Sequence, residues 1–415
     1  MNRKSRPFTA AALAAMLAPL APASSGQPGN WVASWATAEQ TPEPRNALPD
    51  AALTNTTLRQ TVHLSLGGGT WRLRLSNAFG QAPLRIGAAH VARPRAPGAA
   101  DIDAGSDTPV LFDGRTEIVI PAGAEYLSDA FHFEAAAGTS IAISLYLPEA
   151  PQGQTSHPGS RTTSHLVHDN QVAAPSLQQT TSFEHWFVIA GLDVQAAPDM
   201  AAIVILGDSI ADGRGSTTNG NDRWSDALAA RLAAAKLPLA VLNEGIGGNR
   251  LLDDGLGPNA LARLDRDVLA QSGARYLILH EGINDLGTFG AAGGRSDAEH
   301  EELVRRIIGA YRQIIERAHG RGIKVIGGTL TPYAGPTYHP TARDETDRRQ
   351  INEWIRAAGH FDAVADFDRA LRDPDRPLQF RPEYDSGDHL HPSPEGYRAM
   401  AEAVPLPLSG RKGLR

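Results

Sequence analysis

Cysteine is absent from this chain of 415 residues, which excludes disulfide bonds, thiolate nucleophiles and zinc–thiolate sites. Basic residues are in deficit: 39 Lys and Arg stand against 46 Asp and Glu, giving a net charge of −7. This charge gives no support to the binding of nucleic acid or of an anionic membrane, so we expect no nucleic-acid partner. The hydrophobic content of 41% is ordinary, and the length suggests two domains.

Long apolar runs are also missing, apart from one near the N-terminus. Arg3, Lys4 and Arg6 precede an Ala/Leu-rich stretch over residues 8–20, which is too short to span a bilayer comfortably. Ala21 and Ala23 then provide a small-x-small cleavage site. This order predicts a secretory signal peptide over residues 1–23, a secreted or periplasmic protein, and no transmembrane segment.

Short β-like runs, separated by clusters of Gly, Pro, Asn and Asp, fill residues 50–195. Residues 58–66 and 71–75 alternate apolar with polar side chains around three glycines, which is a hairpin signal. Short strands at such spacing predict a β-sandwich domain of jelly-roll-like form over residues 50–195.

Strand-like and helix-like segments alternate after a link at residues 196–199. Apolar runs near residues 203–206, 239–242, 276–279, 324–329 and 363–367 predict strands, and segments 224–237, 259–271, 296–320, 341–359 and 395–403 predict helices. Repeated strand–helix units predict an α/β domain over residues 196–405, with a parallel sheet covered by helices on both faces. We expect residues 31–37 to join this domain.

Ser209 stands where the first of these strands ends, in the sequence Gly207-Asp208-Ser209. A strand followed by a tight turn and a helix lifts a side chain above the carboxyl edge of an α/β sheet, where such folds hold their sites. A serine in this position is also a common turn former or helix cap. This stretch alone therefore leaves catalysis open.

Three further blocks follow in order. Asn243 and Gly248 bracket the first, Gly282-Ile-Asn284-Asp285 is the second, and Asp388-His-Leu-His391-Pro is the third. Together with the Ser209 block they resemble the SGNH hydrolase family of GDSL-type esterases and lipases, over roughly the C-terminal half. The resemblance implies a flavodoxin-like three-layer α/β/α fold. It also implies catalytic residues Ser209, Asp388 and His391, and an oxyanion hole made by Ser209, Gly248 and Asn284.

The residue types in these blocks suit ester hydrolysis, which needs a nucleophile, a base, an orienting carboxylate and donors for the oxyanion. Asp388 and His391 are three residues apart, so both side chains can face the same way, whereas the neighbouring His389 diverges. Gly248 has no Cβ to keep its N–H away from a substrate. Taken singly, the glycines also fit a flexible loop, and Asn284-Asp285 also fits a turn.

Other site types find little support. Glu281 lacks a second carboxylate at a spacing typical of glycosidases, no His-x-x-x-His pair suggests a metal, and no Gly-x-Gly-x-x-Gly follows a strand. We therefore expect no metal and no cofactor. Residues 157–161 of the β-rich region could line the cleft, although a polar loop is the default reading.

These observations predict a carboxylic ester hydrolase acting by a Ser-His-Asp mechanism on an ester substrate. By analogy with exported relatives that carry an added β domain, we expect it to deacetylate carbohydrate, such as acetylated xylan. A lipase or short-chain carboxylesterase is the alternative. A carbohydrate-binding protein with an inert hydrolase domain is an alternative of another class, disfavoured by the intact Ser209, Asp388 and His391. We expect the β-sandwich to assist substrate choice without supplying catalytic groups.

Overall fold

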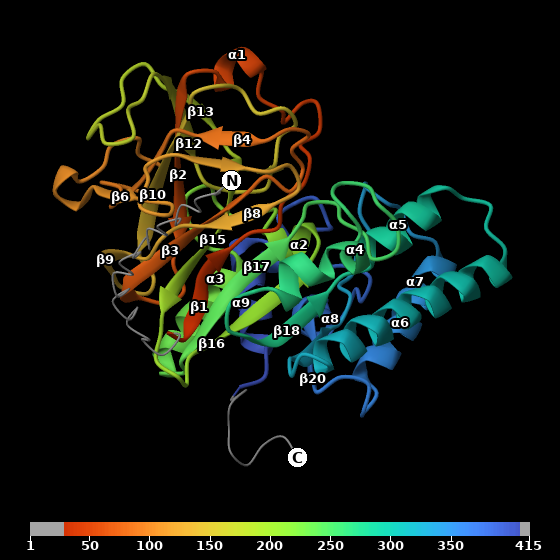
Figure 1. Cartoon of the computed structure of the whole chain (residues 1–415). Helices are drawn as coiled ribbons and strands as arrows, with labels where there is room; N and C mark the ends of the chain where they lie inside the picture. Colours follow the sequence, from red (N-terminus) through yellow and green to blue (C-terminus); the bar gives the residue numbers. More distant parts are fainter. Residues whose placement is uncertain (1–28, 407–415) are drawn as a thin grey trace, which may run out of the picture.

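The computed structural model describes residues 29–406, and the predicted signal peptide lies outside them. Figure 1 shows antiparallel strands at the upper left and an α/β part below and to the right. No helix within residues 29–406 is long and apolar enough to cross a membrane.

Two antiparallel sheets form the N-terminal part, as predicted for a β-sandwich. The first has the order β1 (Trp31–Ala36), β15 (Ile189–Gln195), β3 (Gly68–Ser76) and β8 (Glu125–Leu127), and β9 (Phe131–Ala135) also pairs with β3. The second has the order β13 (Thr181–Phe183), β12 (Ser164–His168), β2 (Thr56–His63), β10 (Ser140–Leu147), β5 (Ala88–Ala92) and β6 (Thr108–Val110). The strand pairs β4 (Leu84–Ile86) with β7 (Ile118–Ile120) and β11 (Ser156–His157) with β14 (Trp186–Phe187), and the short helices α1 (Asp50–Leu53) and η1 (Ala104–Ser106), complete it.

Strands β2 and β3 do not form the predicted hairpin, because they belong to opposite sheets. The chain between them crosses from one sheet to the other. This crossing lets the apolar side of β2, with Leu58 and Val62, and the apolar side of β3, with Trp71 and Leu73, contribute to one buried core. Alternation alone reports which face of a strand is buried and not which strand pairs with it.

Strand β1 lies in the antiparallel sheet and not in the α/β sheet that we expected it to join. It pairs with β15 from Trp31 to Ala36, so the antiparallel part begins before residue 50. A parallel bridge between Thr37 and Asn243, and a hydrogen bond of 3.0 Å from the Ala33 N–H to the Ser272 carbonyl, connect it to the α/β part. The expectation that residues 31–37 join the α/β domain was therefore wrong, although they contact it.

The α/β part contains the predicted parallel sheet. Its order is β17 (Leu239–Gly245), β16 (Ala201–Gly207), β18 (Ala274–His280), β19 (Lys324–Gly328) and β20 (Ala363–Ala365), with every neighbouring pair parallel. Numbered along the chain this is 2-1-3-4-5, the flavodoxin-like order that the resemblance implied.

Helices cover both faces of this sheet, and its strand β16 is apolar on both sides. Ile203 and Ile205 of β16 belong to one hydrophobic cluster, with α3 (Trp224–Ala234), α8 (Phe367–Leu371) and α9 (Pro394–Ala403). Val204 and Leu206 belong to the other, with α4 (Ala260–Leu264), α6 (Asp297–His319) and α7 (Ala342–Arg356). The remaining helical segments are α2 (Ser209–Asp212), η2 (Asp265–Leu269), α5 (Ile283–Ala291) and η3 (Pro382–Tyr384).

The second cluster continues from the α/β part into the β-sandwich. Val32 and Trp71 of the sandwich belong to the same buried cluster as Val204 and Leu277 of the parallel sheet. Across this boundary Arg74 Nη2 donates to Gln271 Oε1 at 2.6 Å, with both side chains buried. The two parts are therefore packed together rather than tethered by a flexible link.

Candidate active site

Ser209 is the first residue of helix α2, directly after strand β16. Asp208 caps this helix by accepting a hydrogen bond from the Ile210 N–H at 2.9 Å. A Cβ on Gly207 would lie 2.5 Å from the His280 carbonyl oxygen, so glycine lets the strands stay close where the chain turns. The helix ends at Gly213, whose φ of 96° suits glycine. This turn presents Ser209 at the carboxyl edge of the sheet.

His391 and Asp388 meet Ser209 from the loop before α9, 182 residues further along the chain. Ser209 Oγ lies 2.8 Å from His391 Nε2, and His391 Nδ1 lies 2.6 Å from Asp388 Oδ2. Ser209 and His391 are buried, with exposed fractions of 6% and 5%. The structure thus brings the three predicted catalytic side chains into one hydrogen-bonded chain.

Asp388 is held as a carboxylate. Partial burial raises its pKa, but the hydrogen bond from the His391 ring and those from the Leu390 and His391 N–H groups outweigh burial, so the pKa lies well below its usual range. The backbone bonds are 3.0 and 2.8 Å long and occupy Oδ1, which leaves Oδ2 for the ring. The His391 ring is therefore oriented with Nδ1 as donor and Nε2 toward the serine.

His389 takes no part in this chain. Its ring is exposed and hydrogen-bonds Asp385, and its φ is 60°. The expected divergence of His389 from the Asp388–His391 pair agrees with this arrangement.

Gly248 and Asn284 line the same cavity as Ser209 and His391. Gly248 has a φ of 72°, a conformation that favours glycine. Asn284 lies in the first turn of α5, where its Nδ2 donates to the Asn249 carbonyl at 2.8 Å and its Oδ1 accepts from the Tyr338 hydroxyl at 2.6 Å. One hydrogen on Nδ2 is used by the Asn249 carbonyl, and the two contacts together fix the orientation of the amide and hence the direction of its other hydrogen.

Asp285 ties helix α5 to the glycine-bearing loop. Its two oxygens accept hydrogen bonds from the Leu251 and Leu252 N–H groups, at 2.8 and 2.9 Å. Burial raises its pKa to about 6 despite these two bonds. Asp285, which the sequence placed in the same block as Asn284 without a role of its own, therefore connects Asn284 to the loop that carries Gly248.

The cavity over these residues has a volume of about 400 Å³ and lies between the two parts of the molecule. The α/β part supplies Arg214, Thr337 and Tyr338 besides the residues above, while the N-terminal part supplies mostly polar side chains. These are Gln40, Glu43, Arg45, Asn46, His157, Arg161, Glu184 and His185. The N-terminal part thus forms one wall of the cleft, as residues 157–161 suggested.

His157 differs from the polar loop residue that we expected. Its exposed fraction is 3%, its Nδ1 donates to the Ala38 carbonyl at 2.7 Å, and its Nε2 lies 3.0 Å from Asp212 Oδ1. Asp212 is the last residue of the helix that begins with Ser209. This contact could not be predicted because the two residues are 55 positions apart and no motif marks His157, although Asp212 follows Ser209 by three residues.

Arg263 is a second residue that sequence analysis missed. Its buried guanidinium donates to the Gly207 and Glu244 carbonyl oxygens, at 2.9 and 2.6 Å, and to Asn249 Oδ1 at 3.0 Å. It thereby joins the ends of β16 and β17 to the loop that carries Gly248. An arginine in a helical pattern gives no sequence signal for such a role.

Carboxyl groups beneath the site are held out of water. Burial raises the pKa of Asp208 to about 7, and burial with the nearby Asp208 carboxyl raises that of Glu281 well above its usual range. Glu281 is 1% exposed and does not line the cavity. It is therefore not placed to contact a substrate in this cavity.

One group of possible metal ligands occurs within residues 29–406, at His300, Asp344 and Asp347. Each of its residues already has a polar or charged partner. His300 Nδ1 lies 2.5 Å from Asp347 Oδ2, Arg343 lies 3.0 Å from Asp347 Oδ1, and Asp344 caps helix α7. The contacts of this group are those of an ion-pair network beside α6 and α7.

Comparison with known proteins places these features in a class. Residues 205–399 match the sequence profile of the GDSL-like lipase/acylhydrolase family, a stretch that contains all the predicted site residues. No curated protein gave a significant match.

Several solved structures are similar over about half of the chain. A G-D-S-L family lipolytic protein from Desulfitobacterium hafniense is 22% identical, with 49% of this chain and 97% of that chain covered and a TM-score of 0.37. An acetyl xylan esterase is 20% identical, covering 49% and 96%, with a TM-score of 0.36. A carbohydrate acetylesterase from Sinorhizobium meliloti is 17% identical, covering 49% and 96%, with a TM-score of 0.36.

The profile match and the α/β/α architecture define an ester hydrolase. The C-terminal part of the chain, from residue 205 to 399, belongs to the GDSL-like lipase/acylhydrolase family, and an antiparallel β-sandwich precedes it.

Proposed function

We propose that this ester hydrolase is an exported serine esterase that removes acetyl groups from carbohydrate. The observation that carries the proposal is the unbroken hydrogen-bonded chain from Ser209 through His391 to Asp388, at the floor of a polar cleft. The hydrogen-bonded chain supports the proposed hydrolysis of an ester, and the polar lining of the cleft supports the proposed preference for carbohydrate.

Ser209 is the proposed nucleophile and His391 the base. As the serine oxygen attacks the ester carbonyl, its proton passes to His391 Nε2, and the Asp388 carboxylate stabilises the resulting imidazolium. The same proton then passes to the departing alkoxide, which leaves an acetyl group on Ser209. Water, deprotonated by His391, attacks this acyl-enzyme and releases acetate, and the serine recovers its proton.

The oxyanion of each tetrahedral intermediate needs donors that are already in place. The Ser209 N–H is at the start of a helix, where it has no intrahelical partner. The Gly248 N–H and the Asn284 amide, held by Asn249 and Tyr338, are the other proposed donors. Fixed donors of this kind stabilise developing charge without reorganisation during the reaction.

The lining of the cleft supports a hydroxyl-rich alcohol moiety over a long acyl chain. Apart from glycines, Pro158, Leu256 and Leu390 are the apolar residues among the described residues that line it. The other lining residues carry hydrogen-bonding groups, among them Arg45, Glu184 and Tyr338. A lipase would need an extended apolar surface for its acyl chain, so the lipase alternative is less well supported.

A hydrolysis screen tests the substrate proposal. Wild-type protein and a Ser209→Ala control would be assayed on acetylated xylan, acetylated monosaccharides and p-nitrophenyl esters of rising chain length. We expect the highest kcat/KM on acetyl esters, with release of acetate from the acetylated sugars. A kcat/KM that rises with acyl chain length, with no acetate released from sugars, would instead establish the lipase alternative.

Export is a separate part of the proposal and rests on the sequence of residues 1–23. Expression of the full chain in a Gram-negative host, followed by N-terminal sequencing of the periplasmic or extracellular protein, tests it. We expect a new N-terminus after Ala23. An intact N-terminus on protein retained in the cytoplasm would reject this part alone.

A further inference from the structure

We propose that His157 of the β-sandwich is a positioning residue for the nucleophile. Its hydrogen bond to Asp212 holds helix α2, and through this helix Ser209, in the geometry that His391 needs. This inference rests on the proposed role of Ser209. It gives the N-terminal part a share in the catalytic geometry, in place of the purely substrate-selecting role that the sequence suggested.

Helix α2 has little stability of its own. It contains four residues, Ser209 to Asp212, and so short a helix depends on side-chain contacts. Asn243 Nδ2 donates to the Ala211 carbonyl at 2.7 Å, and a Cβ on Gly245 would lie 2.3 Å from the Asp212 nitrogen. Strand β17 therefore supports α2 from the side of the parallel sheet.

The contact from the β-sandwich meets α2 at its last residue. The His157 ring, stacked on Trp186 with centroids 5.6 Å apart, bonds the Ala38 carbonyl with one nitrogen and Asp212 with the other. Gly159 lies so close that a Cβ there would be 1.9 Å from Asp212 Oδ2. The Asp212 carboxylate is thus in close contact with residues 157–159 of the β-sandwich. The position of these residues therefore determines the position of the C-terminal end of α2.

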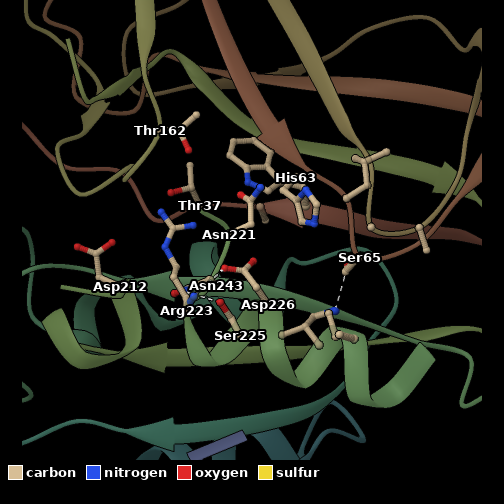
Figure 2. Close-up of a pocket in the computed structure, with 18 of the residues that line it drawn as sticks. Thr37, His63, Ser65, Thr162, Asp212, Asn221, Arg223, Ser225, Asp226 and Asn243 are labelled. Atoms are coloured by element: carbon tan, nitrogen blue, oxygen red, sulfur yellow. Dashed lines mark hydrogen bonds between the residues drawn. The ribbon is translucent and has the colours of Figure 1, made fainter. Parts of the chain in front are cut away.

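The Asp212 end of the helix also borders two cavities. His157 and Asp212 line the active-site cleft, and they also line a second cavity of about 140 Å³ between the two parts. Figure 2 shows Asp212 and Arg223 rising from the α/β side toward Thr37 and Thr162 on the other side of this second cavity. Besides the close approach of Gly159, the hydrogen bond between His157 and Asp212 connects the Asp212 side chain directly to the β-sandwich.

A small displacement of α2 would reach the reacting atoms because Ser209 is only three residues from Asp212. The 2.8 Å contact between Ser209 Oγ and His391 Nε2 connects helix α2 to the loop before α9. His157 contacts α2 and not this loop, so a movement of α2 would change the distance between the two reacting groups. A misplacement of about 1 Å at a reacting group can cost about 10²-fold in rate. We therefore expect loss of His157 to lower kcat while leaving the binding of a small ester nearly unchanged.

The test compares the full-length variants His157→Ala, His157→Gln and Asp212→Asn with wild type on p-nitrophenyl acetate. For His157→Ala and Asp212→Asn we expect kcat to fall by about 10- to 100-fold, with KM changed by less than about threefold. His157→Gln keeps one donor toward Asp212 and should retain more activity than His157→Ala. The double variant His157→Ala/Asp212→Asn should be no slower than the slower single variant, because both changes remove one contact.

His90→Ala is the matched control. His90 forms the same kind of histidine–aspartate contact, at 3.0 Å with Asp107, within the β-sandwich but away from the cleft. Its removal should leave kcat within about twofold, since a peripheral contact is worth little to the transition state.

Several outcomes would overturn the inference. These are a folded His157→Ala variant with kcat within twofold of wild type, an effect confined to KM, or losses that multiply in the double variant. If His157→Ala does not fold, the kcat values of His157→Gln and Asp212→Asn decide by the same criteria. Retained turnover in Ser209→Ala would reject the proposed nucleophile instead, so the two failures can be told apart.

Discussion

At the scale of single residues, the proposed catalytic chain depends on which atoms are already engaged. Asp388 Oδ1 is occupied by two backbone N–H groups, so only Oδ2 faces the His391 ring. The ring then has one orientation that satisfies both nitrogens, with Nε2 toward Ser209. The local sequence Asp388-His-Leu-His391 suffices for this arrangement, which explains how a short motif could predict it.

Asn284 is the residue whose removal most directly tests the proposed oxyanion hole. Asn284→Ala should lower kcat by about 10²–10³-fold, because one positioned donor is lost. Tyr338→Phe removes the hydroxyl that bonds Asn284 Oδ1 at 2.6 Å and should cause a smaller loss in the same direction. Steady-state kinetics on p-nitrophenyl acetate measure both. Unchanged kcat in folded Asn284→Ala would exclude the amide as a donor.

At the scale of elements, the long and strongly patterned segments could be predicted from the sequence, whereas several shorter ones could not. Helix α6 lies within the predicted 296–320 because Ser296 and Glu299 form a capping box and Gly320 follows the last turn. Helices α2, α5 and α8 were not predicted. They are short, and tertiary contacts such as Asn243 with Ala211 stabilise them more than local propensity does.

Strand β17 and helix α2 provide a prediction about close packing. Gly245→Ala should lower both the melting temperature and kcat, because the new Cβ would lie 2.3 Å from the Asp212 nitrogen and displace helix α2, which carries the proposed nucleophile. Thermal unfolding and kinetics on the same preparation measure the two effects.

Gly309 is the control for this substitution. It lies in helix α6, and a Cβ there would meet nothing within 4 Å. Gly309→Ala should stabilise the protein by about 0.5–1 kcal/mol, the usual difference between Gly and Ala in a helix, and leave kcat unchanged. A Gly245→Ala variant as stable and active as Gly309→Ala would contradict the account of α2.

At the scale of the whole molecule, the contact between the two parts buries acidic groups. Burial raises the pKa of Glu39 to about 8, with the Glu125 carboxyl adding to the effect, and burial raises that of Glu244 well above its usual range. Glu244 remains bonded to Gln271 at 2.9 Å. These groups favour their protonated forms in the folded protein, whereas the unfolded chain ionises them near pH 4.5.

This burial predicts that stability falls with rising pH. A carboxyl whose pKa is raised by folding contributes stability below its unfolded pKa, and this contribution is lost as the pH rises through the folded value of about 8. The free energy of unfolding should therefore decrease between about pH 5 and 8, by about 1.4 kcal/mol for each unit of pKa displacement. Glu39→Gln should flatten this slope.

Urea unfolding at several pH values in this range measures the slope. Glu117→Gln is a suitable control, because Glu117 is exposed and its pKa is lowered by the Arg85 side chain. It should leave the slope unchanged. Stability that rises through this range, or an equal slope in Glu39→Gln, would show that the buried carboxyls do not govern it.

The relation between the two parts was the least predictable from sequence. The four blocks that contain Ser209, Gly248, Asn284 and His391 lie in the α/β part. Each is a weak signal alone, and they could be recognised together from their order along the chain. His157 could not, because its partner Asp212 is supplied by the other part and no local pattern marks an isolated histidine that becomes buried. The same holds for Arg263, whose acceptors include backbone carbonyls of two distant strands.

The central claim, that Ser209 is the nucleophile of this ester hydrolase, is tested most directly by covalent labelling. Wild-type protein and Ser209→Ala would be treated with a serine-directed organophosphonate, and the modified peptide identified by mass spectrometry alongside turnover of p-nitrophenyl acetate. We predict stoichiometric labelling of Ser209 with loss of turnover in wild type, and neither labelling nor turnover in Ser209→Ala. Labelling at another residue, with turnover retained in Ser209→Ala, would contradict the account.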